Sequence, residues 1–202
     1  MPLPRVTGLP AHRIFSPPSL IAIIFSLLCS QATIAEGWLK QGAQELILSG
    51  GKGLGSALIQ QKSIAGAGMV GANWSYQFYD YPSNHHLQWW AQVSYSHMWH
   101  DYQGRDQKQN IWELKPVLRW YPQREAVGFF GEVGVGAAYL TERSFGAIDL
   151  STNLNFSLHF AAGYTLQSDN SLSLRYSHFS NGYTNTPNPG FDFASINWHT
   201  KF

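Results

Sequence analysis

The sequence predicts an all-β fold, an eight-stranded antiparallel transmembrane β-barrel of the bacterial outer membrane. Three observations predict it. Many segments alternate apolar and polar residues with the period of two that a half-exposed strand requires. Charged residues make up 12% of the chain and aromatic residues 15%, whereas soluble domains carry roughly 25% charged residues. After residue 35, no stretch is long and apolar enough to cross a bilayer as a helix.

The expected strands each have roughly the 9–11 residues that a tilted membrane strand needs. They cover residues 41–49, 70–79, 87–99, 111–121, 129–139, 153–166, 172–180 and 194–202. An even number of strands lets both termini of the barrel domain lie on the periplasmic side. The longer polar stretches between them, at residues 50–63, 100–109, 142–152 and 181–191, are expected to be outer loops.

Charged residues decide which face of each strand meets the lipid. Glu113, Lys115, Arg119, Glu132 and Arg175 lie opposite the apolar faces of their strands. A basic residue facing lipid at the bilayer midplane costs roughly 2–4 kcal/mol. The apolar faces are therefore expected to point outward and the charged faces inward. A soluble lipocalin-like barrel would need the reverse arrangement, which would place these charged side chains outside and the apolar ones within.

The N-terminal residues 1–35 read as a signal peptide for export. Arg5 and Arg13 precede a short apolar core at residues 20–28, and small residues before Glu36 suit cleavage. Residues 36–202 would then form the barrel domain. The expected location is the Gram-negative outer membrane, which the chain would cross several times.

Composition excludes several classes of function. Cys29 lies within the expected signal peptide, so the exported domain would hold no disulfide or thiolate metal site. Cleavage of the signal peptide would remove Arg5 and Arg13 and leave 11 basic and 12 acidic residues. This balance lacks the excess of basic residues that is typical of nucleic-acid-binding proteins. The histidines lack the spacing of a metal site, so no metal is expected. A homodimer is compatible with the sequence but not indicated by it.

The candidate chemistry lies near the C-terminus. His178, Ser180 and Asp192 share even-numbered positions in two segments that we expect to form neighbouring strands. Same-parity residues project from one face, so a hairpin centred near residue 186 would set Ser180 opposite Asp192, with His178 diagonal to Asp192. The expected roles are nucleophile for Ser180, general base for His178 and orienting carboxylate for Asp192.

An acyl-transfer site also needs donors for the developing oxyanion. The side chains of Asn181 and Asn188, or a backbone N–H in the loop that holds them, are candidates. Asn188-Pro189-Gly190 is also ordinary turn chemistry, so a structural role for Asn188 stays open.

The segments His178-Phe179-Ser180-Asn181 and Asn188-Pro189-Gly190 resemble the lipid A 3-O-deacylase (PagL) family. The resemblance extends to the expected signal, the strand pattern and the terminal Phe202. It implies a cofactor-free serine esterase that removes the ester-linked 3-hydroxyacyl chain at position 3 of lipid A. Carried over, Ser180 is the nucleophile and His178 the base, while Asp192 stands where the family has a glutamate, one methylene longer.

The expected partners are therefore lipopolysaccharide as substrate and the surrounding outer-membrane lipids. Two other functions stay open from the sequence. A non-catalytic structural or adhesin-like barrel would need neither His178 nor Ser180. An outer-membrane phospholipase would use the same nucleophile on a different ester.

Overall fold

The computed structural model describes residues 42–55, 64–81, 87–122, 128–166 and 170–202. Ten strands lie in these residues. They are β1 (Gln44–Gly53), β2 (Gly68–Asp80), β3 (Leu87–Tyr102), β4 (Arg105–Trp120), β5 (Gly128–Leu140), β6 (Ser144–Phe145), β7 (Ile148–Asp149), β8 (Leu154–Thr165), β9 (Asn170–Ser180) and β10 (Phe191–Lys201). The expected signal peptide and most of the expected loop at residues 50–63 lie outside the described residues. No helix among the described residues is long and apolar enough to cross a membrane.

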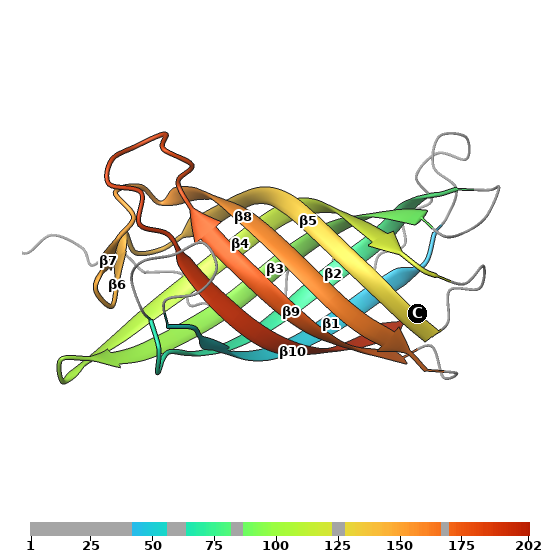
Figure 1. Ribbon diagram of the computed structural model, residues 1–202, viewed down its shortest axis with the longest axis horizontal. Coiled ribbons are helices and arrows are strands. Elements are labelled where there is room, and N and C mark those ends of the chain that lie inside the picture. Colours follow the sequence, from blue (N-terminus) through green and yellow to red (C-terminus); the bar gives the residue numbers. More distant parts are fainter. Residues whose placement is uncertain (1–41, 56–63, 82–86, 123–127, 167–169) are drawn as a thin grey trace, which may run out of the picture. The chain divides into compact units, whose positions relative to one another are not determined.

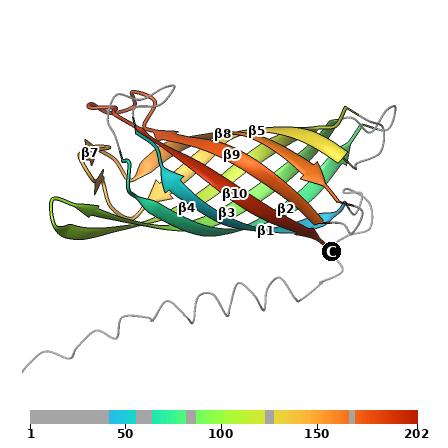
Figure 2. The same cartoon turned by 60° about the horizontal axis from the view of Figure 1, so that its bottom comes forward.

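Eight of the strands close into one antiparallel barrel (Figure 1), in the order β1-β10-β9-β8-β5-β4-β3-β2. Each of these eight strands therefore has a partner on both edges, so the barrel has no edge of unpaired backbone groups. The other two strands, β6 and β7, form a small hairpin between β5 and β8. This hairpin and the β9–β10 connection lie at the same end of the barrel, which we call the loop end (Figure 1). The C-terminus lies at the opposite end (Figure 2).

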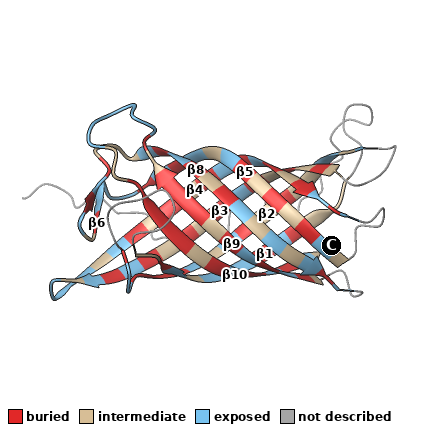
Figure 3. Ribbon diagram, viewed as in Figure 1, coloured by how far each residue is buried: buried red, intermediate tan, exposed pale blue. Residues whose placement is uncertain are grey.

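The predicted alternation of faces is confirmed. Along the strands, buried and exposed residues follow one another in stripes (Figure 3). In β4, for example, Leu114 is 62% exposed, whereas its neighbours Glu113 and Lys115 are buried. The outward faces are apolar and the inward faces largely polar, as membrane barrels require.

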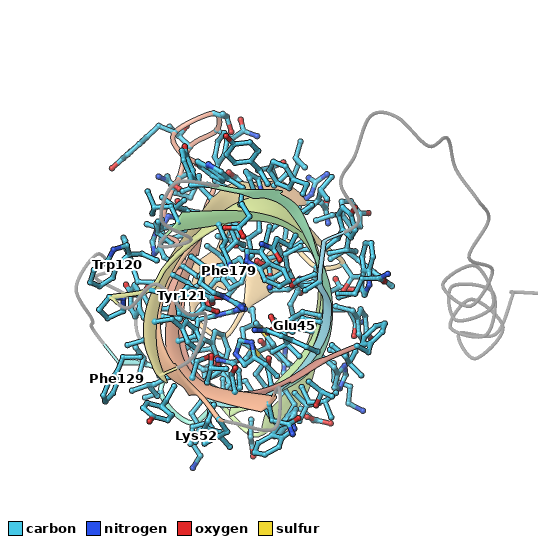
Figure 4. All side chains as sticks on the ribbon, turned by 90° about the vertical axis from the view of Figure 1, so that its right-hand side faces the viewer. Glu45, Lys52, Trp120, Tyr121, Phe129 and Phe179 are labelled. Atoms are coloured by element: carbon cyan, nitrogen blue, oxygen red, sulfur yellow. The ribbon has the colours of Figure 1, made fainter. Side chains whose placement is uncertain are left out.

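Charged side chains from four strands meet inside the barrel. Nη1 and Nη2 of Arg119 donate to the carboxylate of Glu45 at 3.2 and 2.7 Å, and its Nε donates to Glu132 at 2.6 Å. Nη2 of Arg175 reaches the second oxygen of Glu132 at 3.3 Å. Glu45 points into the lumen in the view along the axis (Figure 4). These side chains form the lumenal ion network, in which each carboxylate has a cation.

Toward the loop end the lumen becomes apolar. A cluster of buried side chains fills it: Ile64, Ala67, Met69, Met98, Ile111, Ala138, Leu140, Phe145, Ile148, Leu150, Phe179, Phe191 and Phe193. The rings of Phe179 and Phe191 lie 5.1 Å apart and 30° from parallel. This packing joins β9 and β10 from the inside, directly behind the candidate chemistry.

Two of the expected outer loops have more regular structure than the sequence predicts. Residues 100–109 were expected as a loop, but β3 and β4 continue through them and pair as far as Tyr102 and Arg105. Gln103 and Gly104 turn the chain with φ of 53° and 72°, the left-handed conformation of a tight hairpin. The expected loop at residues 142–152 contains the β6–β7 hairpin.

Candidate active site

The three candidate catalytic residues lie at the loop end on two neighbouring strands. His178 and Ser180 are at the end of β9, and Asp192 is the second residue of β10. They share the parity of Leu174 and Ile196, which are 62% and 61% exposed. The candidates therefore share the outward side of the barrel wall with these exposed residues.

The register differs from the expected one by two residues. Asp192 pairs directly with His178, whereas the sequence suggested that Ser180 would lie opposite Asp192. A shift of two residues preserves parity, so the face is unchanged while the pairing is different. The correction brings the acid and the base closer together and leaves the serine at the strand end.

His178 and Asp192 form a close pair. Nδ1 of His178 lies 2.6 Å from Oδ1 of Asp192. Asp192 is only 1% exposed and His178 is 8% exposed, so this contact is shielded although it lies on the outer face. A carboxylate at this position holds the ring with Nδ1–H toward Asp192, which directs Nε2 away from the acid.

Ser180 lies two residues from His178 on the same face and is half-buried. It pairs with Phe156 of β8. Two residues along a strand separate the Cα atoms by about 7 Å. Within the described residues, no hydrogen bond joins Ser180 to His178. Direct proton transfer requires Oγ and Nε2 to approach to about 2.6–3.2 Å, which depends on the side-chain rotamers of both residues.

Tyr176 is a site residue that sequence reasoning missed. It pairs with Ala194 and lies diagonally from Asp192 on the same face, where its hydroxyl interacts with the carboxylate. Neither Tyr176 Oη nor Asp192 Oδ2 makes a well-formed hydrogen bond to any described residue, and both atoms are buried. Tyr176 lies two residues before His178 and has the same parity, so the sequence could have indicated that both share one face. Tyrosine is also common on lipid-facing strands, so parity alone does not mark it as a site residue.

Asn181 ties the β9–β10 loop together. Its Nδ2 lies 3.0 Å from Leu150 O, 3.0 Å from Ser151 Oγ and 2.9 Å from Pro187 O. Its Oδ1 accepts a 2.9 Å hydrogen bond from the backbone N–H of Tyr183. The side chain is fully buried. The amide of Asn181 is thus engaged within the loop on both its donor and its acceptor side.

Asn188 is bonded through its oxygen. Asn188 Oδ1 accepts a 2.9 Å hydrogen bond from the backbone N–H of Asn181. This bond orients the amide and leaves Nδ2 of Asn188 without a partner among the described residues. Of the two candidate oxyanion donors, Asn188 is therefore the one that retains a side-chain N–H. Among the described residues, no group of three or more His, Cys, Asp or Glu side chains is arranged to hold a metal ion.

Fold and site together define a class, an outer-membrane β-barrel with a candidate acyl-transfer site on its lipid-facing wall. The family model described as lipid A 3-O-deacylase (PagL) matches residues 68–201. Because this match covers more than half of the chain, the chain belongs to the lipid A 3-O-deacylase (PagL) family.

Known relatives agree with this assignment. The lipid A deacylase PagL of Bordetella bronchiseptica is 31% identical over 109 residues, which are 53% of this chain and 58% of that protein. The match thus spans little more than half the length of this curated relative. The crystal structure of the outer membrane enzyme PagL superimposes with a TM-score of 0.59 at 16% identity, covering 77% of this chain and 98% of that one.

Other outer-membrane barrels are similar in fold. The N-terminal β-barrel domain of Pseudomonas aeruginosa OprF has a TM-score of 0.51 at 12% identity, covering 80% of this chain and 98% of that one. Neisserial surface protein A has a TM-score of 0.50 at 14% identity, covering 83% and 100%. At such identities the likeness of these solved structures shows the fold alone. It confirms the predicted eight-stranded membrane barrel.

Proposed function

We propose that this protein is a lipid A 3-O-deacylase, a serine esterase that hydrolyses the ester-linked 3-hydroxyacyl chain at position 3 of lipid A. The observation that carries the proposal is the contact of 2.6 Å between His178 and Asp192, on the outward face beside Ser180. A buried acid–base pair has no structural purpose on a lipid-facing surface, where apolar residues would be more stable. Membership of the family supplies the substrate class.

The proposed reaction follows the general serine esterase scheme. Ser180 Oγ attacks the ester carbonyl while Nε2 of His178 takes its proton, and Asp192 stabilises the imidazolium that forms. Collapse of the tetrahedral intermediate breaks the bond to the sugar oxygen, which receives the proton from His178. A water molecule, deprotonated by His178, then attacks the acyl-enzyme; the 3-hydroxy fatty acid is released as His178 returns that proton to Ser180 Oγ. These steps need no cofactor.

Asn188 is the oxyanion donor that the hydrogen bonds favour. Its Nδ2 retains its hydrogens, whereas Asn181 uses Nδ2 to hold the loop. A preorganised donor of this kind contributes about 2.7–4 kcal/mol to the stabilisation of an acyl-transfer transition state. Asn181 then acts indirectly, because its backbone N–H fixes the amide of Asn188.

Tyr176 is proposed as a positioning residue for Asp192. Aspartate is short, and its Oδ2 would remain buried without a partner. A hydrogen bond from the Tyr176 hydroxyl to Oδ2 would satisfy both atoms and hold Oδ1 against the imidazole. The two residues lie diagonally across the β9–β10 pair on the same face, which brings the hydroxyl to the side of the carboxylate.

The setting is the outer membrane, reached through the expected signal peptide. A substrate with several acyl chains can remain in the bilayer while its sugar occupies the headgroup zone. An outward-facing site at the loop end meets such an ester without removing the substrate from the membrane. The chemistry requires no second subunit, so a homodimer stays an open expectation.

The test is mass spectrometry of lipid A from a Gram-negative host that expresses wild type, Ser180→Ala or Ser177→Ala. Ser177 is a matched control because it lies on the same strand but faces the lumen and is buried. We expect wild type and Ser177→Ala to remove one 3-hydroxyacyl mass, and Ser180→Ala to lose roughly 10⁴-fold or more in rate. Folding of each variant is checked by gel mobility with and without heating.

Other results would support the alternatives. Equal deacylation by wild type and Ser180→Ala would contradict Ser180 as nucleophile. Fatty acid release from phospholipids, with lipid A unchanged, would indicate a phospholipase. No lipid product from any correctly folded variant would favour a structural or adhesin-like barrel.

A further inference from the structure

Lys52 is an unusual cation of this barrel because it lies on the outward face of β1. It is exposed, and its side chain points away from the barrel in the view along the axis (Figure 4). Leu46 and Leu48, which share its parity on β1, are exposed apolar residues. A lysine on this side faces lipid or lipid headgroups, and its cost falls from about 2–4 kcal/mol at the midplane to about 0–1 near the interface.

Lys52 also differs from the barrel's inward-facing cations. Arg119 and Arg175 contact carboxylates of the lumenal ion network, and Lys115 donates to Glu113 at 2.5 Å. By contrast, Lys52 contacts no carboxylate among the described residues. An unpaired ammonium at a membrane surface is free to bind an anion supplied from outside the chain.

The position of Lys52 relative to the candidate site follows from the strand register. Lys52 pairs with Ala194 of β10, and the backbone N–H of Leu54 donates to Asp192 O at 2.9 Å. Lys52 is therefore diagonal to Asp192 on the same outward face. From Ser180 it is separated by two strand spacings and by four residues along β9, which places the Cα atoms about 17 Å apart. The long, flexible lysine stem shortens that gap.

The residues next to Lys52 have small side chains or none, and an aromatic ring lies nearby. Its two cross-strand partners are Gly68 and Ala194, and at Gly50 an added Cβ would meet no atom within 4 Å. The ring of Trp99 lies over Gly68, where an added Cβ would approach Trp99 Cε2 to 2.3 Å. Trp99 is 41% exposed. A glycine at position 68 therefore leaves room for the indole over the cross-strand neighbour of Lys52.

We infer that Lys52, with Trp99 beside it, forms an anion subsite that binds a phosphate carried by the glucosamine backbone of the substrate. The inference rests on the proposed function and adds the feature of the substrate that this face recognises. Lipid A is a phosphorylated glucosamine disaccharide, so its ester and its phosphates belong to one rigid headgroup. An indole offers an apolar face to sugar C–H groups, and the ammonium offers three donors to phosphate oxygens.

The subsite would work by orienting the headgroup. Binding a phosphate at Lys52 restricts rotation of the sugar over the barrel wall and brings the position-3 ester toward Ser180. The interaction is the same before and during the reaction, so it contributes to substrate binding and little to the chemical step. Its loss should raise KM and leave kcat nearly unchanged.

The experiment compares two substrates with three purified, refolded proteins in detergent micelles. The substrates are bisphosphorylated lipid A and the same lipid A after phosphatase treatment. The proteins are wild type, Lys52→Met, and the control Lys201→Met, whose lysine is the last residue of β10 and lies at the opposite end of the barrel, beside the C-terminus. Methionine keeps the length of the lysine stem. For Lys52→Met, we expect KM on phosphorylated lipid A to rise about tenfold, with no change on the dephosphorylated substrate.

Lys52→Arg gives a second reading, since it keeps the charge and should retain most of the affinity for phosphorylated lipid A. If Lys52→Met changes neither KM, or raises both equally, the phosphate subsite is wrong even though the enzyme is active. If folded wild type releases no acyl chain from either substrate, the proposed function itself fails, and the subsite fails with it. The two failures are therefore distinguishable.

Discussion

The carboxylates and cations of this barrel are paired differently in the lumen and on the outer face. In the lumen, Arg119 binds both Glu45 and Glu132 at close range, and Arg175 reaches the remaining oxygen of Glu132. On the outer face at the loop end, Asp192 Oδ2 has no well-formed hydrogen bond to any described residue, and Lys52 has no described carboxylate partner.

The difference separates stability from function. Lumenal carboxylates that each contact a cation can be explained by folding alone, because each would be costly if left unpaired. Polar groups with unused hydrogen-bonding capacity on a lipid-facing wall have no such explanation. A bound substrate can supply the hydrogen-bond partners that these groups lack. Charged or polar character alone would not have distinguished the two regions, since both contain acid–base contacts shorter than 3 Å.

The largest expected effect comes from the outer acid. Asp192→Asn keeps the size of the side chain but can favour the wrong imidazole tautomer, and kcat should fall roughly 10³–10⁴-fold. The rate of fatty acid release from lipid A measures it. Asp106→Asn, at an exposed position of the β3–β4 hairpin, is the control and should stay near wild type. A loss of less than tenfold in Asp192→Asn would remove Asp192 from the catalytic group.

A change in the lumen should act on stability and not on chemistry. Arg119→Met removes a cation that contacts both Glu45 and Glu132. Removing one partner of a buried ion pair lowers the free energy of unfolding by about 3–5 kcal/mol. Urea unfolding in lipid vesicles, followed by tryptophan fluorescence, should show a lower free energy of unfolding, with kcat of the folded fraction unchanged. Lys108→Met, which removes an exposed pair, should stay within about 0.5 kcal/mol of wild type. Equal stability of both variants would contradict the comparison.

The smallest expected effect tests the link between Tyr176 and Asp192. Tyr176→Phe removes only the hydroxyl and should lower kcat about tenfold with KM unchanged, since a hydrogen bond to a charged group contributes about 1.5–3 kcal/mol. In the Asp192→Asn background the same change should have little further effect, because the two residues act as one unit. Additive losses in the double variant would indicate that Tyr176 only packs against its neighbours.

The barrel and the faces of its strands could be predicted from the sequence because both follow from solvation. Alternation assigns each side chain to lipid or lumen, and the cost of a charge in lipid decides which is which. Residues 100–109 were missed as strand because they are polar on both faces, as is natural where a hairpin extends beyond the apolar zone. The Gln103-Gly104 turn is also a weaker hairpin signal than Asn-Gly or Asp-Gly.

For the candidate site, parity predicted the shared face of His178, Ser180 and Asp192 but not their pairing. Registers that differ by two residues keep every side chain on its face, so alternation cannot choose between them. The choice depends on the conformation of the β9–β10 loop, which Asn181 holds through contacts with Leu150 and Pro187. The contact with Leu150 joins residues 31 apart in the chain, and local sequence patterns carry no information on it.

The filled interior has a consequence for the cell that would make this protein. We expect ions not to pass, because Arg119, Lys115 and Tyr121 are at most 1% exposed inside the wall and an apolar cluster fills the loop end of the lumen. Purified protein in a planar bilayer should therefore give no steady current under an applied voltage. A bacterium could insert many copies without lowering the electrical resistance of its envelope or admitting small toxic solutes, so its abundance is not limited by leakage.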